Sequence, residues 1–221
     1  MRGGPRDHAV LRAFLGPAAH LIPYHYVVEG DLQVIVDGRA PQRVGSGELI
    51  LFPRNDGHVL GSNPTLPPIS AAEIIVPSPR GDLASIHHGG GGTPTRMICG
   101  FLGCDSVQGN PVVATLPAAM ILKVEETGPA FQYAAQEVAS GRPGSATVLA
   151  KLSELLFVGA VRRYVEDLPE DQTGWLAGLR DPLVARTLAL MHGNSPATGA
   201  SRSWAARPGC RARRWPTVSA A

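Results

Sequence analysis

The sequence has few charged residues and almost no lysine, and these shortages limit the kinds of protein it can be. Charged residues make up 17% of the chain, and Lys123 and Lys151 are the two lysines. All 18 acidic side chains and 15 of the 20 basic ones precede Gly193. The body therefore carries a formal charge of −3, which does not form the basic surface expected of a nucleic-acid-binding domain.

Cysteine and long apolar runs are also scarce. The three cysteines, Cys99, Cys104 and Cys210, show no regular pairing pattern, so a disulfide scaffold is excluded. The opening residues, MRGGPRDHAV, lack the apolar core of a signal peptide, and no apolar run is long enough to span a bilayer. We expect a soluble, cytoplasmic protein with reduced thiols.

Apolar residues suffice for a core, and turn-forming residues are frequent. Hydrophobic residues make up 44% of the chain, which also has 26 glycines and 20 prolines. Strand-like segments with turn signals such as Asp37-Gly38 occupy residues 20–63. Further buried strands are expected at 96–105 and 111–124. Short strands at this spacing predict a sandwich or barrel.

Helical patterns follow the strands. Residues 145–168 place apolar side chains three and four positions apart, which predicts an amphipathic helix. Ser145 is the expected N-cap, and Pro169 is expected to end the helix. Asp181 and Pro182 predict the start of a further helix, because aspartate caps helices and proline favours the first helical position.

Three segments in order resemble the AraC-type transcription regulators that carry an N-terminal cupin sensor domain. The segments are HLIPYHYVVEG through GELILFPRNDGHVLGSNP, then IHHGGGGTPTRMICGFLGCDS, then TGWLAGLRDPLVARTLALMH. The resemblance covers roughly residues 16–192. It implies a mainly β fold, a cupin jelly roll over 1–127, followed by a helical linker and dimerisation region over 128–192. Because about 19 residues precede the first matching strand, the jelly roll could be short of N-terminal strands.

The resemblance also implies a partner and a mode of action. A small organic effector would bind in the cupin and bias how a C-terminal pair of helix-turn-helix motifs meets DNA. Those motifs should begin after His192, where the sequence does not supply them. We expect no enzymatic activity and no cofactor. The candidate effector pocket combines polar and apolar side chains, namely Tyr24, His25, Tyr26, Phe52 and His58.

Metal binding is the main alternative for the same region. Cupin enzymes usually hold a metal with a His-x-His pair, which is missing around His25. His25 and Glu29 are four residues apart on a strand and should face the same side, so with His58 they could form a triad of two histidines and one carboxylate. The other interpretation places Glu29 in a turn and the two histidines in a pocket or core. A stand-alone, metal-dependent dioxygenase or isomerase is therefore the competing function.

The stripe on residues 145–168 is the candidate surface for a homodimer. Leu152, Leu155, Leu156 and Tyr164 are its central residues. Packing of the same stripe on the cupin's own sheet is the alternative.

Residues 193–221 carry five arginines and two tryptophans but no Asp, Glu or Lys. A basic arm for nucleic acid is one interpretation. However, GC-rich codons for 200–217, read two nucleotides later, give ESQLGREAGMSRSALAD, which resembles the first helix-turn-helix of an AraC-type reader. We therefore expect a disordered, out-of-frame tail, and a non-functional truncated product remains a third hypothesis.

Overall fold

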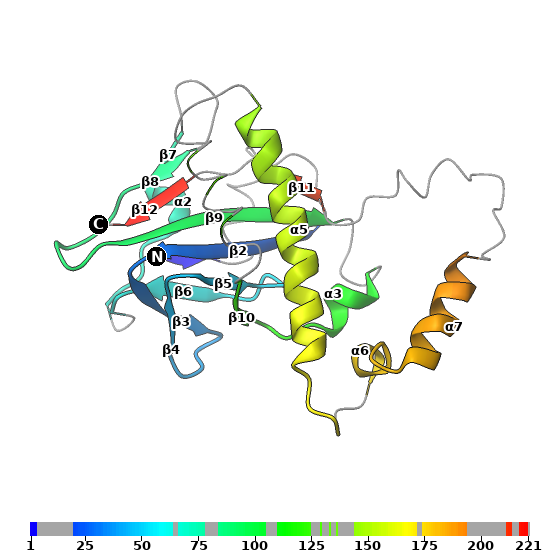
Figure 1. The fold of residues 1–221 in the computed structure, drawn as a ribbon. Coiled ribbons are helices and arrows are strands. Elements are labelled where there is room, and N and C mark those ends of the chain that lie inside the picture. The colour runs from blue at the N-terminus through cyan, green and yellow to red at the C-terminus, as the bar shows by residue number, and fades with distance from the viewer. Residues whose placement is uncertain are drawn as a thin grey trace.

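The fold is a sandwich of two β-sheets with one long helix across an outer face and two shorter helices beyond it (Figure 1). The computed structural model describes residues 1–3, 20–63, 66–77, 84–104, 110–124, 129, 133, 136, 144–171, 174–193, 211–213 and 217–220. This architecture confirms the predicted mainly β fold with helices after the strands. No helix in the described part of the chain has the length and hydropathy needed to cross a membrane.

The smaller sheet has four strands in the order β1-β6-β3-β4. Their bounds are β1 Arg2–Gly3, β3 Asp31–Val36, β4 Gln42–Gly45 and β6 His58–Gly61. All of its strand pairs are antiparallel. In the turn after β3, Asp37 and Gly38 have φ values of 47° and 70°, a backbone conformation that Asp-Gly turns adopt readily.

The larger sheet has the order β10-β5-β2-β9-β12-β8-β7, and β11 pairs with β9. Its strands are β2 His20–Glu29, β5 Glu48–Leu51, β7 Ile75–Val76, β8 Ser85–Ile86, β9 Thr95–Cys104, β10 Met120–Lys123, β11 Arg211–Arg213 and β12 Thr217–Ala220. The pairs are antiparallel except β12 with β8, which is parallel. The long central strands β2 and β9 form the framework of the candidate site.

Alternation along β2 and β9 divides the core into two parts, because successive side chains of a strand point to opposite faces. On β2, Leu21 and Val27 belong to the cluster between the sheets. Ile22 and Tyr24 belong to a second cluster on the outer face of the larger sheet. The sequence of β2 is apolar on both faces because both faces are covered.

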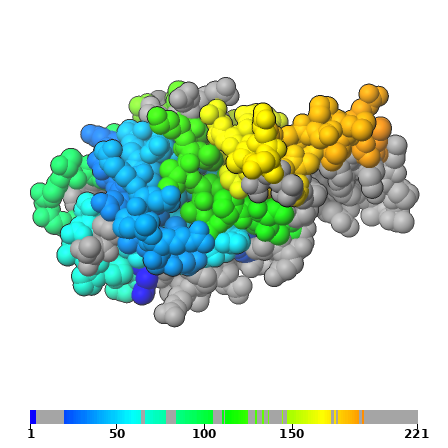
Figure 2. Space-filling view, turned by 90° about the horizontal axis from the view of Figure 1, so that it is seen from below, coloured from blue at the N-terminus to red at the C-terminus, as the bar shows by residue number. Residues whose placement is uncertain are grey.

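The outer cluster is covered by helix α5, Ser145–Glu166. Leu149, Leu156 and Ala160 of α5 are at most 4% exposed against this sheet. In Figure 1 the helix crosses β9, β2 and β5. Figure 2 shows that the helices after α5, α6 (Trp175–Gly178) and α7 (Pro182–Gly193), extend from one end of the molecule.

The helix ends confirm two of the predicted signals and correct one. Gly144, with φ 87°, is the N-cap of α5 and provides no side-chain cap, so Ser145 is the first helical residue rather than the cap. The helix ends before Pro169, as expected. The Asp181 Oδ1 accepts hydrogen bonds from the backbone N–H groups of Leu183 at 2.7 Å and Val184 at 3.2 Å, which caps α7 as predicted.

Two segments that lacked a helical signal begin with short helices. Residues 111–124 open with α3, Pro111–Thr115, and only Met120–Lys123 form a strand. Asn110 caps α3 because its Oδ1 accepts from the Val113 N–H at 3.2 Å. Similarly, α2 (Ala71–Ile74) begins after Ser70, whose hydroxyl accepts from Ala72 N–H. Capping chemistry, rather than apolar periodicity, accounts for both helices.

The described parts of the C-terminal tail are the two short strands β11 and β12. In β12, Thr217 lies opposite Ile98 and Ala220 opposite Thr95. β11 continues along the same edge of β9. The disordered tail over 193–221 stays a prediction. The out-of-frame origin of 193–221 stays a prediction, which the coding DNA through this region would test.

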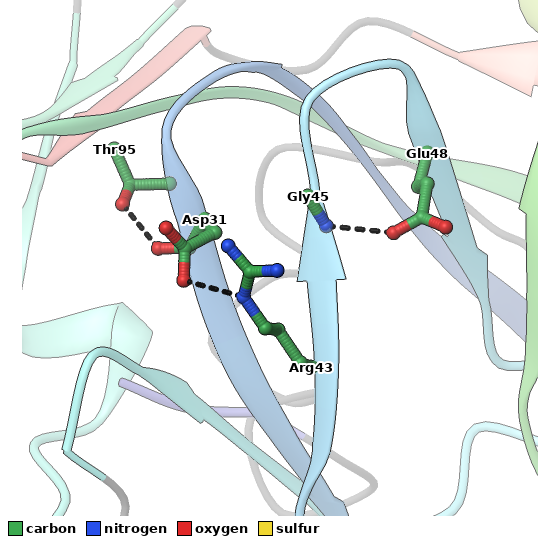
Figure 3. Close-up of polar contacts among 5 residues, drawn as sticks. All are labelled: Asp31, Arg43, Gly45, Glu48 and Thr95. Carbon is green, nitrogen blue, oxygen red and sulfur yellow. Dashed lines mark hydrogen bonds and ion pairs between the residues drawn. The ribbon is translucent and has the colours of Figure 1, made fainter.

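A polar corner fixes the start of β3 against the start of β9 (Figure 3). The Thr95 hydroxyl donates to the Asp31 carbonyl oxygen at 2.6 Å. The Asp31 carboxylate forms an exposed ion pair with Arg43 on β4, at 3.1 Å. The backbone N–H of Gly45 donates to the Glu48 carboxylate at 2.7 Å, which closes the β4–β5 turn. The Thr95–Asp31 and Gly45–Glu48 contacts join the two sheets, whereas the Asp31–Arg43 pair links neighbouring strands of the smaller sheet.

Candidate functional site

A cluster of aromatic and sulfur-containing side chains fills the middle of the sandwich. His25 projects inward from β2 and Cys99 from β9, directly opposite each other in the strand register. The His25 Nδ1 lies 2.7 Å from the Cys99 Sγ, within hydrogen-bonding distance. Phe52 follows β5 and His58 begins β6, and their rings stack at 3.7 Å with an angle of 7°. We call these four residues the inner cluster.

The inner cluster is buried and favours neutral side chains. His25 is 6% exposed, and its Nε2 finds no hydrogen-bond partner among the described residues. Burial, and in smaller part the nearby His58, lowers the pKa of His25 well below its usual value. Burial raises the pKa of the Cys99 thiol. An imidazole and a thiol that are both neutral suit a hydrogen-bonded interior and do not provide a reactive thiolate.

His58 is held in place from three sides. Its Nδ1 lies 2.9 Å from the Asp56 carbonyl oxygen, and its ring faces Phe52. Gly3 of β1 lies against the other edge of the ring, where an added Cβ would approach the His58 Nε2 to 2.6 Å. The ring of His25 meets that of His58 edge-on at 5.7 Å. This packing fixes the orientation of His58 within the sandwich.

The structure divides the five predicted pocket residues between two faces. His25, Phe52 and His58 come together in the inner cluster. Tyr24 and Tyr26 belong to the outer cluster beneath α5, so these five residues do not line one pocket. Their positions follow from strand alternation, since even-numbered residues of β2 face away from His25. Sequence spacing alone did not show that both faces of β2 are buried.

Tyr24 instead connects the larger sheet to α5. Its hydroxyl lies 2.6 Å from the Ser153 Oγ, and Ser153 donates its own proton to the Leu149 carbonyl oxygen at 2.8 Å. The tyrosine is therefore the donor in the first contact. Burial raises the pKa of Tyr24, so the hydroxyl stays protonated. Gly100 on β9 lies beneath the Tyr24 ring. A Cβ added to Gly100 would overlap the Tyr24 hydroxyl.

Replacement of Tyr24 by phenylalanine tests this link. Loss of the buried hydroxyl is expected to lower the free energy of unfolding by about 1 kcal/mol, the usual net contribution of such a hydrogen bond. A double-mutant cycle with Ser153→Ala, followed by urea denaturation, measures the coupling directly. Additive effects of the two substitutions would contradict the contact.

The predicted metal triad is not assembled. The strand register shifts at a β-bulge between Val27 and Glu29, so the two-residue alternation that should align Glu29 with His25 is broken. The Glu29 carboxylate lies at the surface, 3.2 Å from Arg96. Among the residues that the structure describes, no three His, Cys, Asp or Glu side chains form a metal-binding group.

A cavity of about 380 Å³ lies between the sheets, at the end where β3 and β9 begin. Its aliphatic walls come from both sheets and from α2, and include Leu32, Leu60, Ile74, Ile86 and Met97. Its rim is formed by residues 61–63, 66–69 and 88–90 with neighbouring parts of the glycine-rich loop. The volume is within the range of about 300–1,000 Å³ that is typical of small-molecule sites.

The cavity and the inner cluster are adjacent layers of one interior. Met97 on β9 lines the cavity, and Cys99 is the next inward-facing residue. On β6, Leu60 lines the cavity and His58 is the next inward-facing residue. Two residues of a strand span about 7 Å, so the inner cluster lies one side-chain layer deeper than the cavity. No sequence pattern predicted the cavity, because its lining residues come from segments that are far apart in the sequence.

The predicted dimerisation residues also separate on the structure. Leu156 is fully buried against the larger sheet, and Leu152 and Tyr164 are partly buried in the same cluster. Leu155 is 53% exposed on the opposite side of α5. The alternative interpretation, that the stripe packs on the cupin's own sheet, is therefore correct for three of the four residues.

Two packed β-sheets with a cavity between them define the double-sheet jelly-roll class of fold. The cupin family profile matches residues 5–166, so the chain belongs to the cupin family. It is also 27% identical over 193 residues to a Streptomyces lividans protein named "Putative AraC-like transcription regulator". The match covers 85% of this chain and 60% of that relative. The resemblance to cupin-containing AraC-type regulators is thereby confirmed.

Proposed function

We propose that this chain is the effector-sensing part of an AraC-type transcription regulator. It binds a small organic molecule within the cupin sandwich, associates with a second copy of itself, and acts in the cytoplasm without catalysing a reaction. Membership of the cupin family and the similarity to a relative named as an AraC-like regulator support this proposal. DNA binding is part of the proposal only because of the family resemblance. The chain spans 60% of that relative's length.

The observation that carries the proposal is the cavity of about 380 Å³ between the sheets. It opens beside the inner cluster, where a neutral imidazole and thiol are buried. An enzyme acting by acid–base chemistry needs a group whose pKa lies near the working pH and which reaches the substrate. The carboxylates of Asp31, Glu29 and Asp56 are instead in ion pairs with Arg43, Arg96 and Arg54. The arrangement therefore suits binding better than catalysis.

Self-association is assigned to the outer side of α5. Val148, Leu155 and Val158 are 40%, 53% and 45% exposed. At about 100° per residue these three positions fall on one side of the helix, opposite the face that contacts the sheet. A second copy of the chain, presenting the same stripe in a two-fold arrangement, would cover these side chains.

Sedimentation velocity of the purified chain tests the proposed function. We expect a dimer, and we expect Leu155→Arg to weaken it at least about tenfold, equivalent to about 1.4 kcal/mol. Val76→Arg is a matched control, because Val76 is 57% exposed and lies on β7, at the edge of the larger sheet. A strictly monomeric chain, or equal effects of the two substitutions, would refute the proposed interface.

A further inference from the structure

The cavity between the sheets has a chemical character that identifies the class of molecule it can bind. Many of its lining residues have large aliphatic side chains, among them Leu32, Leu60, Leu66, Ile74, Ile86 and Met97. Of these, Leu32, Leu60, Ile86 and Met97 are at most 4% exposed. A molecule that enters this space leaves water and contacts carbon and sulfur atoms on several sides.

Among the described residues that line the cavity, none is Asp, Glu, Lys or Arg. The Met1 α-amino group also lies at the cavity, where it donates to the Leu60 carbonyl oxygen at 2.7 Å, and burial lowers its pKa. Asp31 precedes Leu32 in sequence, but its carboxylate is paired with Arg43 on the surface, as Figure 3 shows. Burying a carboxylate, phosphate or ammonium group without an opposite charge is strongly unfavourable. Organic acids, nucleotides and amino acids are therefore poor candidates for this cavity.

Polar atoms are few and lie toward one end of the cavity. The Thr95 hydroxyl already donates to the Asp31 carbonyl oxygen, so it is committed to the corner between the sheets. Ser62, Asn63 and His88 lie on the rim segments before α2 and after β8. A sugar, with a hydroxyl on nearly every carbon, would leave most of its hydroxyls against the aliphatic walls.

We propose that the cavity between β3, β6, α2, β8 and β9 binds a neutral, largely apolar organic molecule that has few hydrogen-bonding groups. This inference rests on the proposed effector-sensing function and specifies the site and the chemical class of the effector. The aliphatic walls provide affinity, and the rim residues Ser62, Asn63 and His88 provide hydrogen bonds to the polar end of the ligand. The glycine-rich loop at residues 89–92 lies at the entrance.

A pair of fluorescent probes that differ in one charged group tests the chemical class. N-phenylnaphthylamine is neutral and apolar, and anilinonaphthalene sulfonate has the same aromatic frame with a sulfonate added. We expect saturable binding of N-phenylnaphthylamine at one molecule per chain. We expect the sulfonate to bind at least about tenfold more weakly, because no Lys or Arg side chain is among the described lining residues and the Met1 amino group already donates to the Leu60 carbonyl oxygen. Equal binding of the two probes, or no saturable binding of the neutral one, overturns the inference.

Substitutions in and beside the wall test the location. Ile74→Glu places a carboxylate at the cavity wall and should weaken N-phenylnaphthylamine binding at least about tenfold. Val76→Glu is the matched control, since Val76 is exposed, lies two residues away and does not line the cavity. The affinity of the Val76→Glu variant for N-phenylnaphthylamine should stay within about twofold of that of the unmodified chain. Equal losses in the two variants overturn the assignment.

A second pair keeps the test informative if Ile74→Glu does not fold. Gly90 lies at the rim, and a Cβ added there meets no atom within 4 Å. Gly90→Trp should obstruct the entrance and weaken probe binding about tenfold, whereas Gly90→Ala should leave it within about twofold. Binding that resists Gly90→Trp but is lost in His58→Ala would place the ligand in the inner cluster and refute this site. The sedimentation test of the proposed function uses no ligand, so the two proposals can fail separately.

Discussion

Replacement of Leu156 by alanine is expected to lower the free energy of unfolding by about 2–5 kcal/mol, the usual cost of removing a buried leucine side chain. Leu156 is fully buried between α5 and the outer face of the larger sheet. The substitution leaves a void that the surrounding strands cannot close, because β2 and β9 are held by pairing on both sides. Equilibrium denaturation in urea measures the loss.

The matched control for this prediction is Leu183→Ala. Leu183 lies on α7, is 74% exposed, and undergoes the same chemical change in a helix. It should change the free energy of unfolding by less than about 0.5 kcal/mol. Similar losses for Leu156 and Leu183 would show that α5 does not pack on the sheet as described. The comparison also tests whether Leu156 belongs to the core of one chain rather than to the interface of a dimer.

A second large effect is expected when the pH falls below the ordinary pKa of histidine. In the folded chain the pKa of His25 lies well below its usual value of 6.5. Below about pH 6.5 the unfolded chain therefore takes up a proton that the folded chain does not. The contribution of His25 to stability is complete above that pH. It declines by about 1.4 kcal/mol for each pH unit until the folded-state pKa is reached.

Denaturation curves collected between pH 7 and pH 5 separate this contribution from those of other groups. His25→Gln removes the titrating group and should reduce the slope of stability against pH by up to about 1.4 kcal/mol per unit. His87→Gln, in the exposed segment after β8, is the control for the substitution itself. If His25→Gln keeps the full slope, His25 is not buried as the neutral imidazole beside Cys99 and His58.

Local signals in the sequence were sufficient for the strands within residues 20–63 and 96–104 and for the helix ends that depend on side-chain chemistry. They were not sufficient for residues 111–124, where helix α3 precedes a short strand. The Asp37-Gly38 turn and the Asp181 cap are formed as predicted, because each depends on residues adjacent in sequence. The cap at Ser145 was wrong, since Gly144 in a left-handed conformation begins α5 instead. A serine near a helix start does not establish which residue has the cap geometry.

The candidate site was predictable in part, because its composition is local but its arrangement is not. His25, Phe52 and His58 were identified as interior residues and do come together. Tyr24 and Tyr26 were assigned to the same pocket as His25. A strand that is buried on both faces shows no alternation of polar and apolar residues, so the sequence does not indicate which side chains share a face. Glu29 was aligned with His25 by counting residues, and a single bulge invalidates such a count.

Contacts between segments that are distant along the chain could not be predicted from the sequence. The Tyr24–Ser153 hydrogen bond joins residues 129 positions apart, and no spacing rule predicts it. The cavity forms where residues 61–63, 66–69 and 88–93 meet the ends of β3, β6 and β9. Its aliphatic walls are scattered over residues 32–97, so they show no pattern until the two sheets pack together.

Elemental analysis of the purified chain tests most directly whether this cupin is a binding domain rather than a metal-dependent enzyme. The structure places Glu29 at the surface and orients His25 Nδ1 toward Cys99, so the described residues do not assemble a triad for iron, manganese or zinc. We predict that none of these metals co-purifies in stoichiometric amount. A stoichiometric metal that is lost in His58→Ala would contradict the account.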